Sequence, residues 1–326
     1  MTVRRAALIV AVVALALAPY WLPGSYYVNI ATQILFYAIF ALALDLLLGY
    51  GGLVSLGHAG LFGIASYVVA VVVAAGWGHF AAIVAALALT VAATGVFAVM
   101  ALRSIGIGFL MITLALGQIL WGLAYRWITL TNGDNGLNVS TRPAPFGISL
   151  VSATAFYYAV LVIFLIVVAA VAMFVASPFG ASLRGTRDQP RRMNALGYHV
   201  WMIRFCACLF SGLLSAVAGI LFVYYNQFIS PQALALTASA EVVLMVISGG
   251  AGTLLGPIVG AALVVIMKNV ASAYITRWNF LLGAIFVAIV IFMPEGLVPG
   301  TVRFWRWGRK ALASQSAGLA ATGESR

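Results

Sequence analysis

A nearly charge-free stretch dominates the first third of this chain: residues 6–102 contain a single formal charge, Asp45. A soluble fold must cover its surface with polar groups, and this stretch lacks them. The whole chain agrees, because 64% of its residues are hydrophobic and 7% are charged, against about 25% charged in an ordinary globular domain. The apolar runs are continuous and do not alternate with polar residues, so they predict helices rather than barrel strands. We therefore expect an all-α polytopic membrane protein.

Breaks that contain Pro, Gly or Asn divide the apolar sequence into segments. A bilayer core needs roughly 20 apolar residues per helix, and this length predicts about ten spanning helices. Their expected positions are about residues 6–18, 29–48, 53–75, 80–102, 107–128, 152–176, 203–225, 234–248, 256–275 and 279–298. Within residues 234–275, the Gly-rich turn is either a true loop or a re-entrant break.

The basic residues predict the orientation, because Lys- and Arg-rich loops remain cytoplasmic. With the N-terminus inside, thirteen of the seventeen basic residues fall on the cytoplasmic side, and those outside are Arg126, Arg142, Lys268 and Arg277. Both termini are therefore expected in the cytoplasm. The net charge of +11 reflects this topology and contact with membrane lipid, and no nucleic-acid partner is expected. Residues 1–300 form the transmembrane domain, with a cytoplasmic loop at 177–202, and residues 301–326 form a basic, largely disordered tail.

The sequence lacks the usual signatures of catalysis. It contains no Gly-x-x-x-x-Gly-Lys-[Ser/Thr] phosphate loop, and its histidines, His58, His79 and His199, lack metal-site spacing. We expect no catalytic residue, no metal site and no cofactor on this chain, which favours transport over enzymology. A secondary transporter driven by an ion gradient is the lower-ranked alternative, since a proton path calls for more ionisable groups than Asp45 and Glu241.

Two acidic residues stand shortly before two Gly-rich breaks: Asp45 before Gly51-Gly52, and Glu241 before Gly249-Gly250. A carboxylate in the bilayer costs about 2.5–3.5 kcal/mol, so each is expected to face a cavity or a partner. Each acid either lines a substrate path or hydrogen-bonds the backbone of a broken helix. The two breaks resemble each other, which suggests an inverted repeat of broken helices. Close packing of helices at glycines is the alternative.

The long cytoplasmic loop is predicted to form a short helix. Asp188 can cap it, Pro190 fits its first turn and Gly197 ends it. Met193 and Leu196 make an apolar side next to Arg191 and Arg192. The segment is interpreted as a docking site for a cytoplasmic partner; the alternative is a loop whose arginines only fix topology and touch anionic lipid.

Four blocks of the chain, in order between about residues 30 and 298, resemble the branched-chain amino-acid ABC importer permeases of the LivM type. The cytoplasmic block resembles the family's coupling loop, with Gly185-Thr186 where the family often has Ala-Ile. The others resemble its N-terminal, central and C-terminal signatures. The four blocks are Leu183-Arg184 through Gly197-Tyr198, Leu44-Asp45 through His58-Ala59, Thr113-Leu114-Ala115 with Gln118 and Thr131 through Leu137, and Phe228 through Pro231 with Glu241 and Gly249 through Pro257.

The resemblance implies a multi-pass permease subunit in a bacterial inner membrane that works by alternating access. Its implied partners are a homologous LivH-type permease, two ABC ATPase subunits that hold ATP and Mg, and a periplasmic substrate-binding protein. The implied substrates are leucine, isoleucine and valine; similar permeases carry urea, short amides or aromatic acids.

These predictions and the family resemblance indicate two groups of site residues. The group for ATPase coupling is Arg184, Arg187, Asp188, Arg191, Arg192, Met193, Leu196 and Gly197. The group for the translocation pathway or for support of the broken helices is Asp45, Ser55, His58, Thr113, Gln118, Glu241, Gly249 and Gly250.

Overall fold

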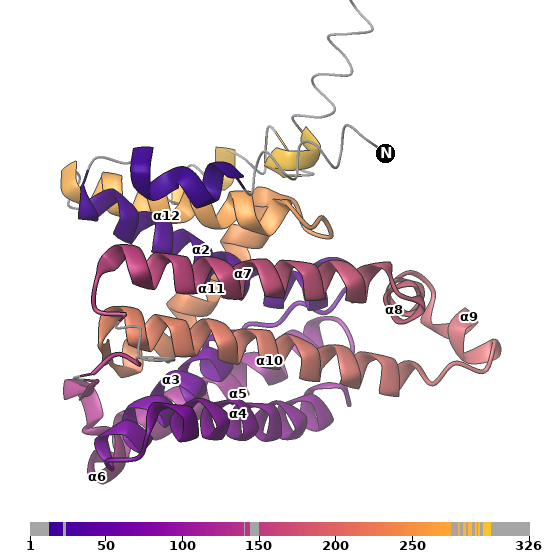
Figure 1. The fold of residues 1–326 in the computed structure, drawn as a ribbon. Helices are drawn as coiled ribbons and strands as arrows, with labels where there is room; N and C mark the ends of the chain where they lie inside the picture. Colours follow the sequence, from indigo (N-terminus) through magenta and orange to yellow (C-terminus); the bar gives the residue numbers. More distant parts are fainter. Residues whose placement is uncertain are drawn as a thin grey trace, which may run out of the picture.

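The computed structural model is a bundle of apolar helices (Figure 1). It describes residues 13–21, 24–139, 141–143 and 150–274, with separate positions between 280 and 300. About half of the predicted spans 6–18 and 279–298, and the whole predicted tail 301–326, lie outside the described residues. The longer helices in chain order are α2 Ser25–Asp45, α3 His58–Ala74, α4 His79–Ala101, α5 Ile107–Arg126, α7 Ala153–Ala176, α10 Val200–Asn226, α11 Leu236–Gly249 and α12 Gly256–Tyr274.

Short elements connect these helices. α6 (Ile128–Thr131) and a 3-10 turn follow α5, and α8 (Pro178–Asp188) and α9 (Pro190–Ala195) separate α7 from α10. A π-helical turn, Leu46–Tyr50, continues α2, and a second 3-10 turn, Pro231–Leu234, precedes α11. Within the described part of the chain, the all-α class holds apart from one small antiparallel pair, in which β1 (Leu137–Asn138) lies against β2 (Phe228–Ile229).

Helix lengths bear on the predicted number of spans. Five described helices are long and apolar enough to cross a membrane: α2 with its π-helical continuation, α4, α5, α7 and α10. α3 is shorter than predicted because residues 53–57, expected inside a span, are not helical. α11 has 14 residues, or about 21 Å at 1.5 Å per residue, which is less than the roughly 30 Å of a bilayer core. The figure of ten spans and the inverted repeat stay predictions.

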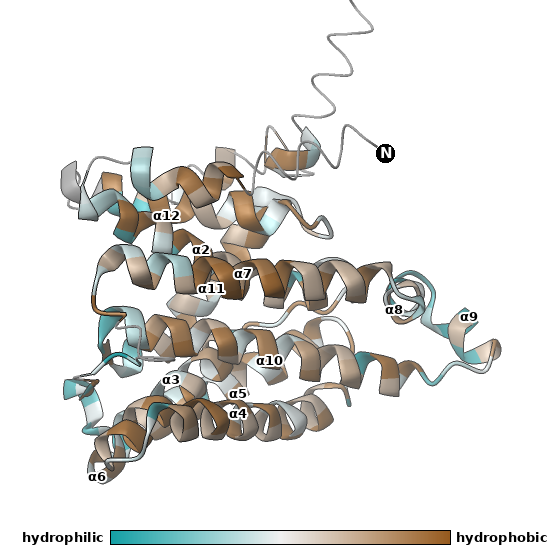
Figure 2. Cartoon of the chain, viewed as in Figure 1, coloured by the Kyte–Doolittle hydropathy of each residue, from teal (hydrophilic) through white to brown (hydrophobic). Residues whose placement is uncertain are grey.

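α2 and α10 form the centre of the bundle. Along α2 and into its π-helical continuation, from Phe36 to Leu47, all side chains are buried except that of Tyr37. α2 packs against α7, α10 and α12, while α10 also packs against α3 and α4. α4, α5 and α7 carry large exposed apolar side chains on their outer faces, among them Val96, Met111 and Ile166. Hydropathy is high along the helices and low at the two ends of the bundle (Figure 2), as a chain surrounded by lipid requires.

The two ends of the bundle differ. At one end, which we call the α8 end, α8 and α9 project from the body (Figure 1). At the opposite end, Arg142 donates to the carbonyls of Tyr224 and Tyr225 in the last turn of α10, at 3.2 Å each. The last carbonyls of a helix have no partner within the helix, so this arginine caps α10 and holds the loop that precedes α7 against it.

The two Gly-rich breaks meet each other near the α8 end. Gly49 packs directly on the backbone of Gly252, and a Cβ at Gly49 would overlap both the Gly252 nitrogen and the Asp45 carboxylate. Gly252 has a φ of +77°, which residues with a Cβ rarely adopt. We call Gly49–Gly52 and Gly249–Gly252, together with Asp45, the glycine joint. Glycine here allows two backbones to touch, and the joint connects α2 with the turn between α11 and α12.

Gly49→Ala tests this contact. The added methyl group must displace the Gly252 backbone, and overpacking of this kind costs about 1–3 kcal/mol. We expect a lower thermal unfolding midpoint for the purified chain in nanodiscs, followed by tryptophan fluorescence. Gly122→Ala on α5 is the matched control, because a Cβ there meets nothing within 4 Å. If Gly49→Ala unfolds at the same temperature as the parent and the control, the breaks do not touch as described.

Candidate functional site

Asp45 is the polar centre of the glycine joint. Its side chain is 1% exposed, and Oδ1 accepts a hydrogen bond of 2.8 Å from the backbone nitrogen of Gly252. A buried N–H without a partner costs about 1–3 kcal/mol, so the carboxylate satisfies a donor that the helix break exposes. Gly249 and Gly250, also predicted site residues, are buried in the same joint. Of the two roles predicted for Asp45, the geometry matches the support of a broken helix.

α8 is fastened to the body by three contacts. Leu183 is fully buried, and Arg204 on α10 donates to the carbonyl of Thr186 at 2.7 Å. Arg187 donates through a guanidinium nitrogen to the carbonyl of Gly49. The same nitrogen would lie 3.8 Å from a Cβ placed on Gly252. One arginine of α8 therefore lies against both halves of the glycine joint.

α9 is much more exposed. Arg191, Arg192 and Leu196 are exposed, the last with 67% of its surface. Met193 is half-buried because its thioether packs on Gly185 of α8. Tyr198, Trp201 and Met202 extend the exposed apolar surface into the start of α10. This end of the protein thus presents apolar side chains with a basic rim.

The predicted cap of this segment is wrong. The sequence suggested one helix with Asp188 at its start, but the structure has two helices, and Asp188 is the last residue of α8. Gln189 precedes α9 and makes no side-chain cap. The cap that exists is Ser177, whose hydroxyl accepts from the Gly180 nitrogen at 3.2 Å and so starts the helical segment eleven residues earlier. Gly197, with a φ of +86°, follows α9, and Arg184 is exposed on α8.

His58 organises a second buried network, between α3, α10 and α2. Its Nε2 lies 2.8 Å from the Ser211 hydroxyl and its Nδ1 lies 2.9 Å from the Ser55 hydroxyl. Ser211 donates its own proton to the carbonyl of Ala43, so it accepts from Nε2–H. Nδ1 then accepts from Ser55, which assigns the neutral Nε2–H tautomer. Each hydroxyl or ring N–H in this chain of hydrogen bonds has an acceptor, which is typical of a structural network.

Thr113 lies beside this network, and Gln118 does not belong to it. The hydroxyl of Thr113 accepts from the Leu56 nitrogen at 3.2 Å and so satisfies the backbone of the first break. Gln118 is half-buried on α5. Gln118 does not line the two cavities that the described residues form between α2, α10, α11 and α12.

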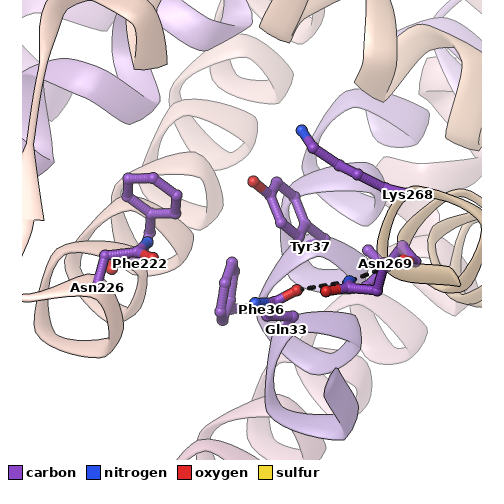
Figure 3. Close-up of a pocket in the computed structure, with 8 residues that line it drawn as sticks. Gln33, Phe36, Tyr37, Phe222, Asn226, Lys268 and Asn269 are labelled. Carbon is purple, nitrogen blue, oxygen red and sulfur yellow. Dashed lines mark hydrogen bonds between the residues drawn. The ribbon is translucent and has the colours of Figure 1, made fainter. Parts of the chain in front are cut away.

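Two cavities lie between α2, α10, α11 and α12, toward the end opposite α8. Their volumes are about 410 Å³ and 330 Å³, in the range of small-ligand sites. Tyr37, Phe222, Asn226 and Lys268 line both. In Figure 3, Tyr37 lies between Phe222 and Lys268, and Phe36 lies on the side of α2 toward Phe222. Asn269 donates to Gln33 at 3.0 Å and ties α12 to α2 below this space.

Glu241 lines the larger cavity. It forms an ion pair with Lys268, whose Nζ lies 3.1 Å from Oε2. Sequence reasoning treated Lys268 only as a basic residue of the outer side, and so missed this partner. A signal was available: one lysine in an apolar span and one acid in the preceding span predict a pair. Ser211 and Tyr37 were missed as well, since nothing in their local sequence marks them.

Comparison with known proteins gives these features a context. Residues 26–290 match the sequence model of a family described as branched-chain amino acid transport system / permease component. The high-affinity branched-chain amino acid transport system permease protein LivM of Salmonella typhimurium is 27% identical, over 92% of this chain and 76% of the relative. LivM of Escherichia coli is 28% identical over the same shares.

A second group of relatives matches a shorter stretch. The autoinducer 2 import system permease protein LsrC of Photorhabdus laumondii is 34% identical, over 39% of this chain and 41% of the relative. No solved structure matches the chain.

Substitution of Asp45 separates hydrogen bonding from charge. Asp45→Asn keeps the oxygen that accepts from Gly252, so it should insert normally and retain most transport. Asp45→Leu removes the acceptor and leaves the Gly252 N–H unpaired, which should cost about 1–3 kcal/mol and lower the yield of folded protein. Membrane expression and substrate uptake measure the two effects. Loss of uptake in a normally expressed Asp45→Asn variant would show that the charge itself is required.

Proposed function

Because the chain belongs to the family of permease components of branched-chain amino acid transport systems, we propose that it is the membrane-spanning subunit of an ATP-driven importer of leucine, isoleucine and valine. Its partners are a homologous LivH-type permease, two ABC ATPase subunits and a periplasmic substrate-binding protein. ATP and Mg bind to the ATPase subunits. In the bacterial inner membrane, the α8 end and both termini face the cytoplasm, and the cavities open toward the periplasmic half.

The observation that carries this proposal is the division of the segment between α7 and α10. α8 is fixed to the body through Leu183, Arg204 and Arg187, whereas α9 is exposed. A coupling element has to meet both requirements: one part accessible to a partner, and one part rigidly joined to the helices that move. A loop that only fixes topology requires neither.

Arg187 supplies the link from this segment to the transport path. A partner that displaces α9 also displaces α8, and Arg187 then transmits this movement to the glycine joint. The joint ends α2 and turns α11 into α12, and these three helices line the cavities. Closure of the ATPase subunits would thus open or close the cavities by shifting helices around their breaks, which is alternating access.

The cavity walls support an amino acid with an apolar side chain. Aromatic rings from α2, α3 and α10 line the larger cavity, together with one ion pair and a few hydroxyl and amide groups; the rings are those of Tyr37, Phe40, Phe62 and Phe222. The LivM relatives are named as permeases of branched-chain amino acid transport, which is the same substrate class. Urea and short amides would leave most of this aromatic surface without contact.

Leu196→Asp tests the coupling assignment. Burial of one such leucine in a partner groove stabilises by about 1.5–3 kcal/mol, whereas an exposed arginine pair contributes about 0–1 kcal/mol. Leu196→Asp should therefore release the ATPase subunits, or uncouple hydrolysis from uptake, while the permease inserts normally. Arg192→Ala is the milder companion variant and should weaken docking mainly at low ionic strength. Co-purification of the ATPase subunits and substrate-stimulated ATP hydrolysis are the measurements.

Two results would contradict the proposal. If Leu196→Asp binds the ATPase subunits and transports like the parent, the segment is a topology-setting loop. If the chain alone in proteoliposomes takes up substrate on a proton or sodium gradient, it is a secondary transporter.

A further inference from the structure

We propose that the Glu241–Lys268 ion pair is the point in the path that receives the two charged ends of an α-amino acid. Glu241 receives the ammonium group and Lys268 the carboxylate. The inference rests on the proposed function, since it assigns residues and a recognition chemistry to the same path.

The pair is placed for this role. Glu241 lies on α11 and Lys268 on α12, so the contact joins the two helices that follow one another through the glycine joint. Lys268 lines both cavities and Glu241 the larger one. Their side chains keep 41% and 22% of their surface accessible, respectively. The charges therefore face the cavities and are not sealed between helices.

The ion pair of Glu241 and Lys268 is not explained by a contribution to folding stability alone. Removal of two ions from water is expensive, and a pair in an apolar interior often stabilises no better than well-packed apolar side chains. Asn269 and Gln33 already tie α12 to α2 by a neutral hydrogen bond nearby. A charge pair that is costly in the bilayer and accessible from a cavity points to a charged ligand.

A zwitterion is the ligand that matches both charges. When it enters, its ammonium replaces Lys268 at the Glu241 carboxylate, and its carboxylate binds the released Lys268 amino group. Glu241 and Lys268 then each face an opposite charge of the ligand. Tyr37, Phe40 and Phe222 line the same space and give an aliphatic side chain an apolar surface.

The same chemistry separates the substrate classes that the sequence left open. An aromatic acid would use Lys268 but would leave Glu241 unpaired and repelled by the ligand's carboxylate. Urea and short amides carry no charge, so they gain nothing that would offset the separation of the pair. Only the α-amino acid satisfies both groups.

Two neutral double variants test the inference in the complete transporter: Glu241→Gln with Lys268→Gln, and Glu241→Met with Lys268→Met. Both variants remove the two charges of the pair together, and the methionine variant places unbranched apolar side chains at the two positions. We expect normal insertion and a fall in ATP-dependent uptake of radiolabelled L-leucine of about tenfold or more, the loss expected when hydrogen bonds to charged groups disappear. Arg126→Gln on α5 is the control: it removes one exposed positive charge outside the cavities and should leave uptake unchanged.

Each outcome decides between the claims. A double variant that inserts normally and takes up leucine like the parent overturns the inference and leaves the proposed function intact. Failure of both double variants to insert assigns the pair to folding and overturns the inference as well. If the unmodified transporter imports no α-amino acid, but imports benzoate or acetamide with ATP, the proposed function fails and the inference fails with it.

Discussion

The hydrogen bond from the Gly252 nitrogen to Asp45 is the interaction on which the rest of this structure depends. A helix that stops inside a membrane exposes backbone groups, and no lipid can hydrogen-bond them. Two breaks meet here: Asp45 before the first break accepts from the backbone of the second, and Gly49 lets the two backbones touch. The hydrogen bond from Gly252 removes the cost of an orphaned N–H and so offsets part of the cost of placing a carboxylate in the bilayer, while Oδ2 of Asp45 has no hydrogen-bond partner among the described residues.

The protein holds two further kinds of polar structure. The network of His58, Ser55 and Ser211 is buried and hydrogen-bonded throughout, so it fixes α3 and α10 in one arrangement. The ion pair of Glu241 and Lys268, in contrast, is accessible from cavities. Rigid packing around α10 and an accessible charged cavity beside α11 and α12 together suit a protein in which some helices move against a fixed frame.

Much of the fold could be predicted from the sequence, because hydrophobic runs and glycine breaks are local signals. The membrane class and most helix positions were predicted in this way, and the family was identified from four blocks of sequence that resemble it; the structure and the comparisons confirm them. The partners of the buried polar groups could not be predicted, since Asp45 meets Gly252 and His58 meets Ser211 across more than 150 residues. Asp188 was wrongly expected to cap a helix because Ser177, farther upstream, starts the helical segment.

We infer that Arg187 transmits movement of α8 to the glycine joint, and the number of leucine molecules imported per ATP hydrolysed measures this transmission. Arg187→Met keeps the length of the side chain but removes its hydrogen bond to Gly49, while Leu183 and Arg204 still hold α8 in place. The account predicts that the ATPase subunits stay bound and hydrolyse ATP, whereas leucine per ATP falls by at least about fivefold, the lower range of coupling between linked sites. An unchanged ratio of leucine to ATP in the Arg187→Met transporter would contradict it.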